Sequence, residues 1–113
     1  MAETLRSDGK AVDVTVDATI TKGDVVYKDG FAGIARQDAV SGETIALEIA
    51  QREHEINIGS VAGAKGAILY ITAATGAITA TAGSGKAPFA KVTVAKDSNN
   101  VVWAVLLPQG VVA

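Results

Sequence analysis

His54 is the only histidine in the chain, and it lies near carboxylates that could be its partners in a metal or acid–base site. Those carboxylates are Glu48, Glu53 and Glu55. Zinc sites are built mainly from several histidine and cysteine ligands, and the chain has one histidine and no cysteine. A general base would need an apolar pocket that shifts its pKa, whereas the neighbouring residues are charged. We therefore interpret this stretch as a solvated polar turn.

A glycine-rich loop and two serines also lack the partners that their chemistry requires. Residues 83–86 partly match a phosphate-binding loop, but Ala80 stands where that motif requires glycine and Ala87 where it requires serine or threonine. Ser41 and Ser84 lie in turns of small residues, with no histidine placed to activate either hydroxyl. We interpret the glycine-rich loop as a flexible link and predict no catalytic nucleophile.

Charge and length exclude several further classes of protein. The formal net charge is −2 and both signs are scattered along the 113 residues, so no basic stripe is available for nucleic acid. The longest apolar run, 101–108, is too short to span a membrane, and the first residues lack the apolar core of a signal peptide. The absence of cysteine fits synthesis in a bacterial-type cytoplasm, and we expect no cofactor.

The apolar residues are numerous but small. Hydrophobic residues make up 49% of the chain, whereas aromatic residues make up only 4%. Because large side chains supply most of the buried surface in a core, this composition predicts thin packed layers and further burial against copies of the same chain. We expect an N-terminal arm over 1–10 and a single β domain over 11–113.

The spacing of apolar residues predicts an all-β fold, a small barrel or sandwich of short antiparallel strands. In the clearest strand, 11–20, apolar residues at even positions alternate with Asp and Thr at odd positions. Asp13 and Asp17 then share its exposed face about 13 Å apart, too far for a catalytic carboxylate pair. Asp29-Gly30 predicts a tight hairpin turn. The other predicted strands cover 25–28, 31–36, 67–72, 77–81, 89–95 and 101–107.

Residues 45–56 allow two interpretations. The segment contains many good helix formers, so one helix is possible. Against a helix, Ile45, Leu47 and Ile49 alternate with other residues, which is the period of a strand. We favour two strands joined at 51–53 and keep the helix as the alternative.

Trp103, the one tryptophan, lies in the last predicted strand. The period-two pattern places it on the same face as its apolar neighbours two positions away. The simplest interpretation is that Trp103 is a core residue, and exposure at a subunit contact is the alternative. We expect Tyr27 and Tyr70 to pack equivalently, with their hydroxyl groups at the rim of the core.

One stretch of sequence recurs later in the chain. Residues 22–27 (Lys-Gly-Asp-Val-Val-Tyr) correspond without a gap to residues 65–70 (Lys-Gly-Ala-Ile-Leu-Tyr), and the same register places Gly42 on Gly85. A fixed offset that keeps glycine, tyrosine and apolar positions predicts a two-fold internal repeat of one β unit. Chance matching in a chain rich in glycine and alanine is the alternative.

These two stretches, together with Ser41-Gly42-Glu43 and the late run 101–108, carry a resemblance. In them the chain resembles the small capsid-decoration, or cement, proteins of tailed bacteriophages, over about residues 11–108. The resemblance implies a structural β-rich protein, without catalysis, that binds the outer surface of a mature head as homotrimers at threefold and quasi-threefold positions. There it would bridge subunits of the major capsid protein and stabilise the head.

The resemblance also implies that an N-terminal segment engages the capsid. Because many copies act together on a symmetric surface, each such contact can be weak. No nucleic-acid or membrane partner is implied. The residues that we assign to this capsid-binding arm are Glu3, Thr4, Leu5, Arg6 and Lys10.

The homotrimers that the resemblance implies require a contact between subunits. We therefore name four candidates for this contact. They are Arg36, Arg52, His54 and Trp103.

Two other functions make different demands on the structure. A small enzyme using Glu48, Glu53 or Asp24 would need a deep pocket around a carboxylate with a shifted pKa. A virion-surface adhesion or carbohydrate-binding module would need exposed aromatic rings on which a sugar can stack. Burial of Trp103 and both tyrosines would count against the second of these functions.

Overall fold

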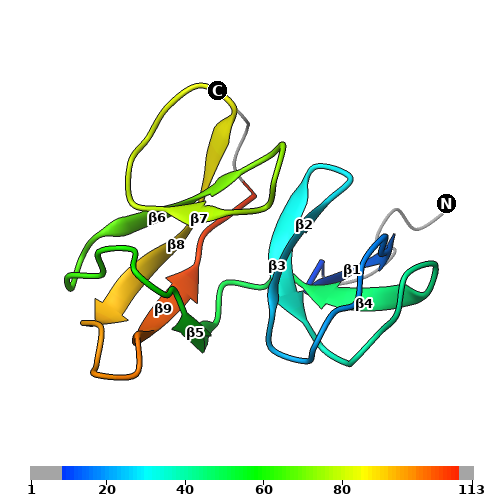
Figure 1. Cartoon of the computed structure of the whole chain (residues 1–113), viewed down its shortest axis with the longest axis horizontal. Coiled ribbons are helices and arrows are strands. Elements are labelled where there is room, and N and C mark those ends of the chain that lie inside the picture. The colour runs from blue at the N-terminus through cyan, green and yellow to red at the C-terminus, as the bar shows by residue number, and fades with distance from the viewer. Residues whose placement is uncertain (1–8, 110–113) are drawn as a thin grey trace, which may run out of the picture.

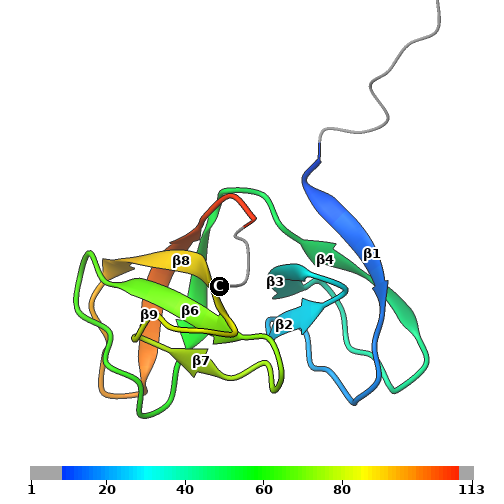
Figure 2. The ribbon, with the colours of Figure 1, turned by 90° about the horizontal axis from the view of Figure 1, so that it is seen from above.

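The computed structural model describes residues 9–109, in which the chain forms nine strands and no helix (Figure 1). The strands make two antiparallel sheets, the first at the right of Figure 2 and the second at the left. The prediction of an all-β fold is confirmed. No helix able to cross a membrane occurs within these residues.

The first sheet comes from the first half of the chain and has the order β1-β4-β3-β2. The hairpin between β2 and β3 turns at Asp29-Gly30, where both residues have positive φ (53° and 86°), as a type I′ turn requires. The predicted hairpin is therefore confirmed. The strands of this sheet are β1 (Ala11–Thr15), β2 (Val25–Lys28), β3 (Phe31–Ala35) and β4 (Thr44–Glu48).

β1 is shorter than the strand predicted over 11–20. Val14 and Val16 are buried as the alternation predicts, but the strand itself ends at Thr15. Beyond Val16 the tight turn at 40–43 interrupts the pairing, which resumes only as a single bridge between Ile20 and Ala39.

The second sheet comes from the second half of the chain and has the order β5-β9-β8-β6-β7. It curls around its inner side chains, so that its outer face is convex (Figure 2). The longest strand, β8, pairs with β6 on one side and with β9 on the other. The strands are β5 (Glu53–Asn57), β6 (Ile68–Thr72), β7 (Ile78–Thr79), β8 (Lys86–Val94) and β9 (Val101–Leu106).

The segment 45–56 forms two strands, as favoured above, and the helix is wrong. β4 belongs to the first sheet and β5 to the second, so residues 49–52 cross from one sheet to the other. Ile45 and Leu47 are 2% and 0% exposed, which fits the strand period. Tertiary packing of these side chains thus prevails over the helix propensity of the segment.

β8 starts at Lys86, three residues before the predicted strand 89–95. Its Pro88 has no N–H to donate, and the ladder to β6 shifts register there, since Tyr70 pairs with Pro88 and Leu69 with Ala90. This bulge lets proline stand inside a paired strand. The preceding loop is also more regular than the predicted flexible link, because Lys86 N–H donates to the Gly83 carbonyl at 3.3 Å.

The buried side chains form two clusters, and β3 contributes to both. Ala32 and Ile34 face the second sheet and join the larger cluster with residues of β5, β6, β8 and β9. Ala35 faces the other way, into the smaller cluster with Val14 and Leu47. β3 is therefore the layer that the two clusters share.

Two contacts allow β3 to be packed this closely. Gly33 lies so near β4 that an added Cβ would stand 2.4 Å from the Glu48 carbonyl oxygen. Where β4 no longer pairs with β3, the side-chain amide of Gln109 replaces it: Ala32 N–H donates to Gln109 Oε1 (2.9 Å) and Gln109 Nε2 donates to the Ala32 carbonyl (3.0 Å). The end of the described chain is thereby fixed to the first sheet.

The turns at the matched positions of the sequence share one geometry. Gly23 and Gly66 both have positive φ (94° and 88°), and in each case a strand starts two residues later. The next elements differ, because β2 pairs with β3 whereas β6 pairs with both β7 and β8. Tyr27 packs on the larger cluster and Tyr70 does not, so the two tyrosines are not equivalent. The two-fold repeat stays a prediction.

Candidate functional site

Of the five residues assigned to the capsid-binding arm, the structure describes one, Lys10. Its carbonyl accepts a hydrogen bond from Ile49 N–H at 3.0 Å, which fixes the start of the domain beside the end of β4. A crevice of about 380 Å³ at this point is lined by residues 9–10, 49–51 and 108–109, so the two ends of the described chain meet there. The other predicted arm residues, Glu3, Thr4, Leu5 and Arg6, lie outside the described residues.

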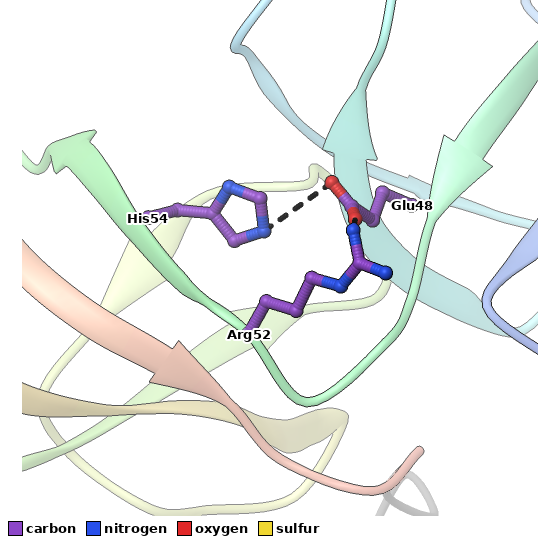
Figure 3. Close-up of polar contacts among 3 residues, drawn as sticks. All are labelled: Glu48, Arg52 and His54. Atoms are coloured by element: carbon purple, nitrogen blue, oxygen red, sulfur yellow. Dashed lines mark hydrogen bonds and ion pairs between the residues drawn. The ribbon is translucent and has the colours of Figure 1, made fainter.

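Three polar side chains meet where the chain crosses between the sheets (Figure 3). Glu48 ends β4, Arg52 lies in the link, and His54 lies in β5. Arg52 Nη1 donates to Glu48 Oε1 at 3.2 Å, and His54 Nε2 lies 3.5 Å from Glu48 Oε2. The side chains of Glu48 and His54 are 11% and 19% exposed, so the interpretation as a solvated turn is wrong for these two residues, whereas Glu53 and Glu55 are exposed. Burial of the carboxylate is tolerated because Arg52 compensates its charge.

His54 contributes a second feature to this cluster. Its Nε2 atom is buried and has no hydrogen-bond partner among the described residues. A crevice of about 400 Å³ opens beside it, and Lys22 and Arg36 are also part of the lining. Two of the four predicted subunit-contact residues, Arg36 and His54, therefore line one crevice. A third, Arg52, donates to Glu48, which also lines it.

The carboxylates considered for catalysis are not gathered in this way. Glu53 and Glu55 are exposed on the opposite face of β5 from His54, and Asp24 accepts the N–H of Thr21 at 2.9 Å within its own turn. Within residues 9–109 no three His, Cys, Asp or Glu side chains are close enough together to hold a metal ion. The geometry at Glu48 is that of an ion-pair link between two sheets.

Trp103 is exposed, and its assignment to the core is wrong. It is 44% exposed, whereas Val102 and Ala104 on either side are fully buried. Both faces of β9 are apolar. The period of a strand therefore shows which residues share a face, but the sequence does not indicate which of the two faces is buried. The exposure that the alternative requires is present, and the subunit contact itself stays a prediction.

Trp103 lies at the middle of an apolar surface that sequence reasoning missed. We call this surface the Trp103 face: the outer side of β5, β9, β8 and β6. Val94, which pairs with Trp103, is 47% exposed, and the outward side chains of the neighbouring positions are half-buried. The signal in the sequence was the uninterrupted apolar run of β9, which supplies residues to both faces. Its apolar members are Ile68, Tyr70, Pro88, Val94, Val101, Trp103 and Val105.

Fold and site together define a small all-β module whose accessible features are surfaces and shallow crevices, the properties of a binding protein. A family model described as "Phage cement protein" matches residues 6–107. The chain belongs to this family of phage cement proteins, which confirms the resemblance drawn from the sequence. The family implies a structural role in stabilising the capsid and a location on the capsid of the virion. No curated protein and no solved structure gives a significant match.

Proposed function

We propose that this protein binds the outer surface of a mature phage head as homotrimers at threefold and quasi-threefold positions. There it contacts the major capsid protein and holds neighbouring capsid subunits together against internal pressure, without catalysis. The observation that carries the proposal is the family match over 6–107, nearly the whole described domain. The arm that begins before Lys10 is proposed as the segment that engages the capsid, since the domain is anchored at that residue.

The composition of the core supports a protein that gains stability by assembly. The largest fully buried side chains are Ile, Leu and Val, and Phe89 is the one aromatic residue in the buried core of residues 9–109. Such thin layers bury little surface per residue, and contacts with other chains add to it. Each copy can bind weakly, because many copies act on one closed surface.

The experiment that tests this function uses phage heads stripped of decoration. The purified protein should bind expanded heads, and density should saturate at the threefold and quasi-threefold positions in an electron cryomicroscopy reconstruction. Decorated heads should also rupture at a higher temperature than bare heads. Equal rupture temperatures would remove the stabilising role, and no binding to heads in either state would remove the function altogether.

A second candidate function, carbohydrate binding at the virion surface, is favoured by one observation. Trp103 presents an exposed ring on a sheet face, and Tyr70 is half-buried on the same face. Sugars stack on such rings. A glycan array probed with the intact protein separates the candidates: binding that is lost in Trp103→Ala supports adhesion, and the absence of any bound glycan excludes it.

A further inference from the structure

The Trp103 face combines exposed apolar residues with charges of opposite sign on its two sides. Trp103 and Val94 are two of the three large hydrophobic residues that are most exposed within residues 9–109. On one side of β9, the edge strand β5 presents the exposed Glu55 beside Trp103. On the other side, β8 presents the exposed Lys91. Neither charge has an ion-pair partner in the described part of the chain.

The ladder fixes how these charges are placed about β9. Glu55 pairs with Trp103, and Lys91 pairs with Val105, two residues further along β9. Neighbouring strands are about 4.8 Å apart, so acid and lysine stand on opposite sides of β9 with a stagger of about 7 Å along it. Glu53 pairs with Val105, as Lys91 does, but its carboxylate already accepts a hydrogen bond from the Thr93 hydroxyl.

This arrangement is self-complementary. Suppose that a second copy faces the first across a twofold axis that lies between the two faces and runs parallel to β9. The rotation leaves β9 over β9 and exchanges the two sides, so the β5 side of each copy comes over the β8 side of the other. Glu55 of one copy then lies on the same side as Lys91 of its partner, offset by the same stagger of about 7 Å along β9, which the long lysine side chain can span. The same pair forms a second time by symmetry.

We propose that the Trp103 face is a contact between two copies of this chain, related by such a twofold axis along β9. Trp103 of each copy meets its counterpart at the axis, where two tryptophan rings can pack against each other. The Glu55–Lys91 pairs lie at the two sides and fix the relative orientation of the copies. This twofold contact is different from the contact that holds three copies together in a trimer. It joins two single protomers, or one protomer from each of two neighbouring trimers.

The size of the face predicts that the contact is weak in solution. Three to four strands about 4.8 Å apart and five residues long cover about 300 Å² of sheet per copy, well below the roughly 800 Å² per partner of a stable complex. The convex curvature of the sheet concentrates the contact along β9 (Figure 2). High local concentration, as on a head that carries many copies, is what would populate it.

The first test uses the wild-type protein, because Trp103 is its only tryptophan. Burial of the ring at the contact should shift its fluorescence emission to the blue as the protein concentration rises from micromolar to millimolar. Light scattering on the same samples should show dimers of protomers or of trimers. An emission maximum that is unchanged over this range, in solution and on decorated heads alike, contradicts the proposal.

Site-specific crosslinking supplies the geometric test, since the chain contains no cysteine. Val105→Cys places a thiol on β9 at the proposed axis, so a short bismaleimide should join two copies. Val40→Cys is the matched control: it is 58% exposed but lies in the turn before β4, away from the face. Trp103→Ala in the Val105→Cys background should lower the crosslinked fraction about tenfold, the scale of a central aromatic anchor. Equal crosslinking of the two cysteine variants overturns the proposal.

A mixing experiment tests the charge pairing and the symmetry together, again in the Val105→Cys background. Glu55→Lys alone and Lys91→Glu alone each create two like-charge contacts and should crosslink poorly. An equimolar mixture of the two variants restores both pairs in a heterodimer and should crosslink at least as well as the parent. Both substitutions are at exposed positions, and unchanged thermal unfolding of each variant shows that the fold is kept. No recovery in the mixture overturns the pairing.

The outcome for this contact is separable from the outcome for capsid binding. Val105→Cys protein that decorates heads but gives no crosslink between copies keeps the proposed function and refutes the twofold contact. Protein that crosslinks in concentrated solution but binds no head does the reverse.

Discussion

The two faces of β9 are both apolar, yet only one of them is a core. Val102, Ala104 and Leu106 are at most 1% exposed, whereas Trp103 between them is 44% exposed. The inner face belongs to the larger buried cluster, which also contains Ala32 and Ile34 of β3 in the other sheet. The outer face has no such neighbour within the described residues and carries the largest side chain of the strand. The presence of a packed neighbour, rather than hydrophobicity, therefore separates the two faces.

The largest expected effect comes from removing a side chain on the inner face. Leu106→Ala should lower the free energy of unfolding by about 3 kcal/mol, because the cavity it leaves in a thin core can collapse only partly. Val105→Ala, next to it on the outer face, should cost less than about 1 kcal/mol, since this side chain is only half-buried. Urea unfolding of both variants measures the difference. Equal costs would mean that the two faces contribute alike to the monomer.

The second prediction concerns the close approach of β3 to β4. In Gly33→Ala the new methyl group would stand 2.4 Å from the Glu48 carbonyl oxygen and 2.9 Å from Leu47 Cγ, so the strands must move apart. We expect a loss of about 1 to 3 kcal/mol in unfolding free energy, as in other overpacked cores. Gly83→Ala is the control, because its nearest contact would be 3.7 Å away. A neutral Gly33→Ala in thermal unfolding would show that β3 can shift freely.

The third prediction tests the link at the crossing between the sheets. Glu48→Ala leaves Arg52 without its acceptor and removes the carboxylate that lies 3.5 Å from the buried His54 Nε2, and it should cost about 1 to 2 kcal/mol. The Arg52 side chain is 53% exposed, so solvent screening limits its share of this loss. Glu55→Ala, on the opposite face of β5, should change stability by less than about 0.5 kcal/mol. Chemical denaturation distinguishes the two, and equal effects would deny the link its structural role.

The smallest effect is expected for Gln109, whose side-chain amide bonds to β3 where β4 no longer pairs with it. Gln109→Ala removes two half-buried hydrogen bonds to Ala32 and should cost about 1 kcal/mol. Amide hydrogen exchange is the sharper readout, since the Ala32 N–H should lose protection while the N–H groups within β9 keep theirs. Gln109→Glu retains the acceptor but not the donor and should protect Ala32 almost normally. Unchanged exchange in Gln109→Ala would show that this contact does not hold the end of the domain.

Local features of the fold could be predicted from particular residues. Asp29-Gly30 specified its hairpin because only a few residues accept positive φ at both turn positions. The alternation around Val14 specified a strand with one buried face, and that around Ile45 and Leu47 specified a strand despite good helix formers. Where a signal was purely local, as at these turns and strands, the prediction was confirmed.

Features that depend on a distant neighbour could not be predicted in the same way. β1 ended early because the turn at 40–43 interrupts its ladder, which resumes only at the bridge between Ile20 and Ala39. Pro88 lies in a strand because the ladder to β6 accommodates it with a bulge. His54 was considered together with Glu48, Glu53 and Glu55, but the contact of Glu48 with Arg52 and its burial depended on the crossing between two sheets. None of these partners is adjacent in the chain.

The sequence by itself determined the all-β class, the turns, the periodicity of most strands and the family to which the chain belongs. Only the tertiary structure decided which side of β9 faces inward, and with it that Trp103 lies on the surface. The physical reason is that alternation records two faces of a strand, whereas burial depends on what packs against each of them. For β9 that neighbour is β3, about 70 positions earlier in the chain.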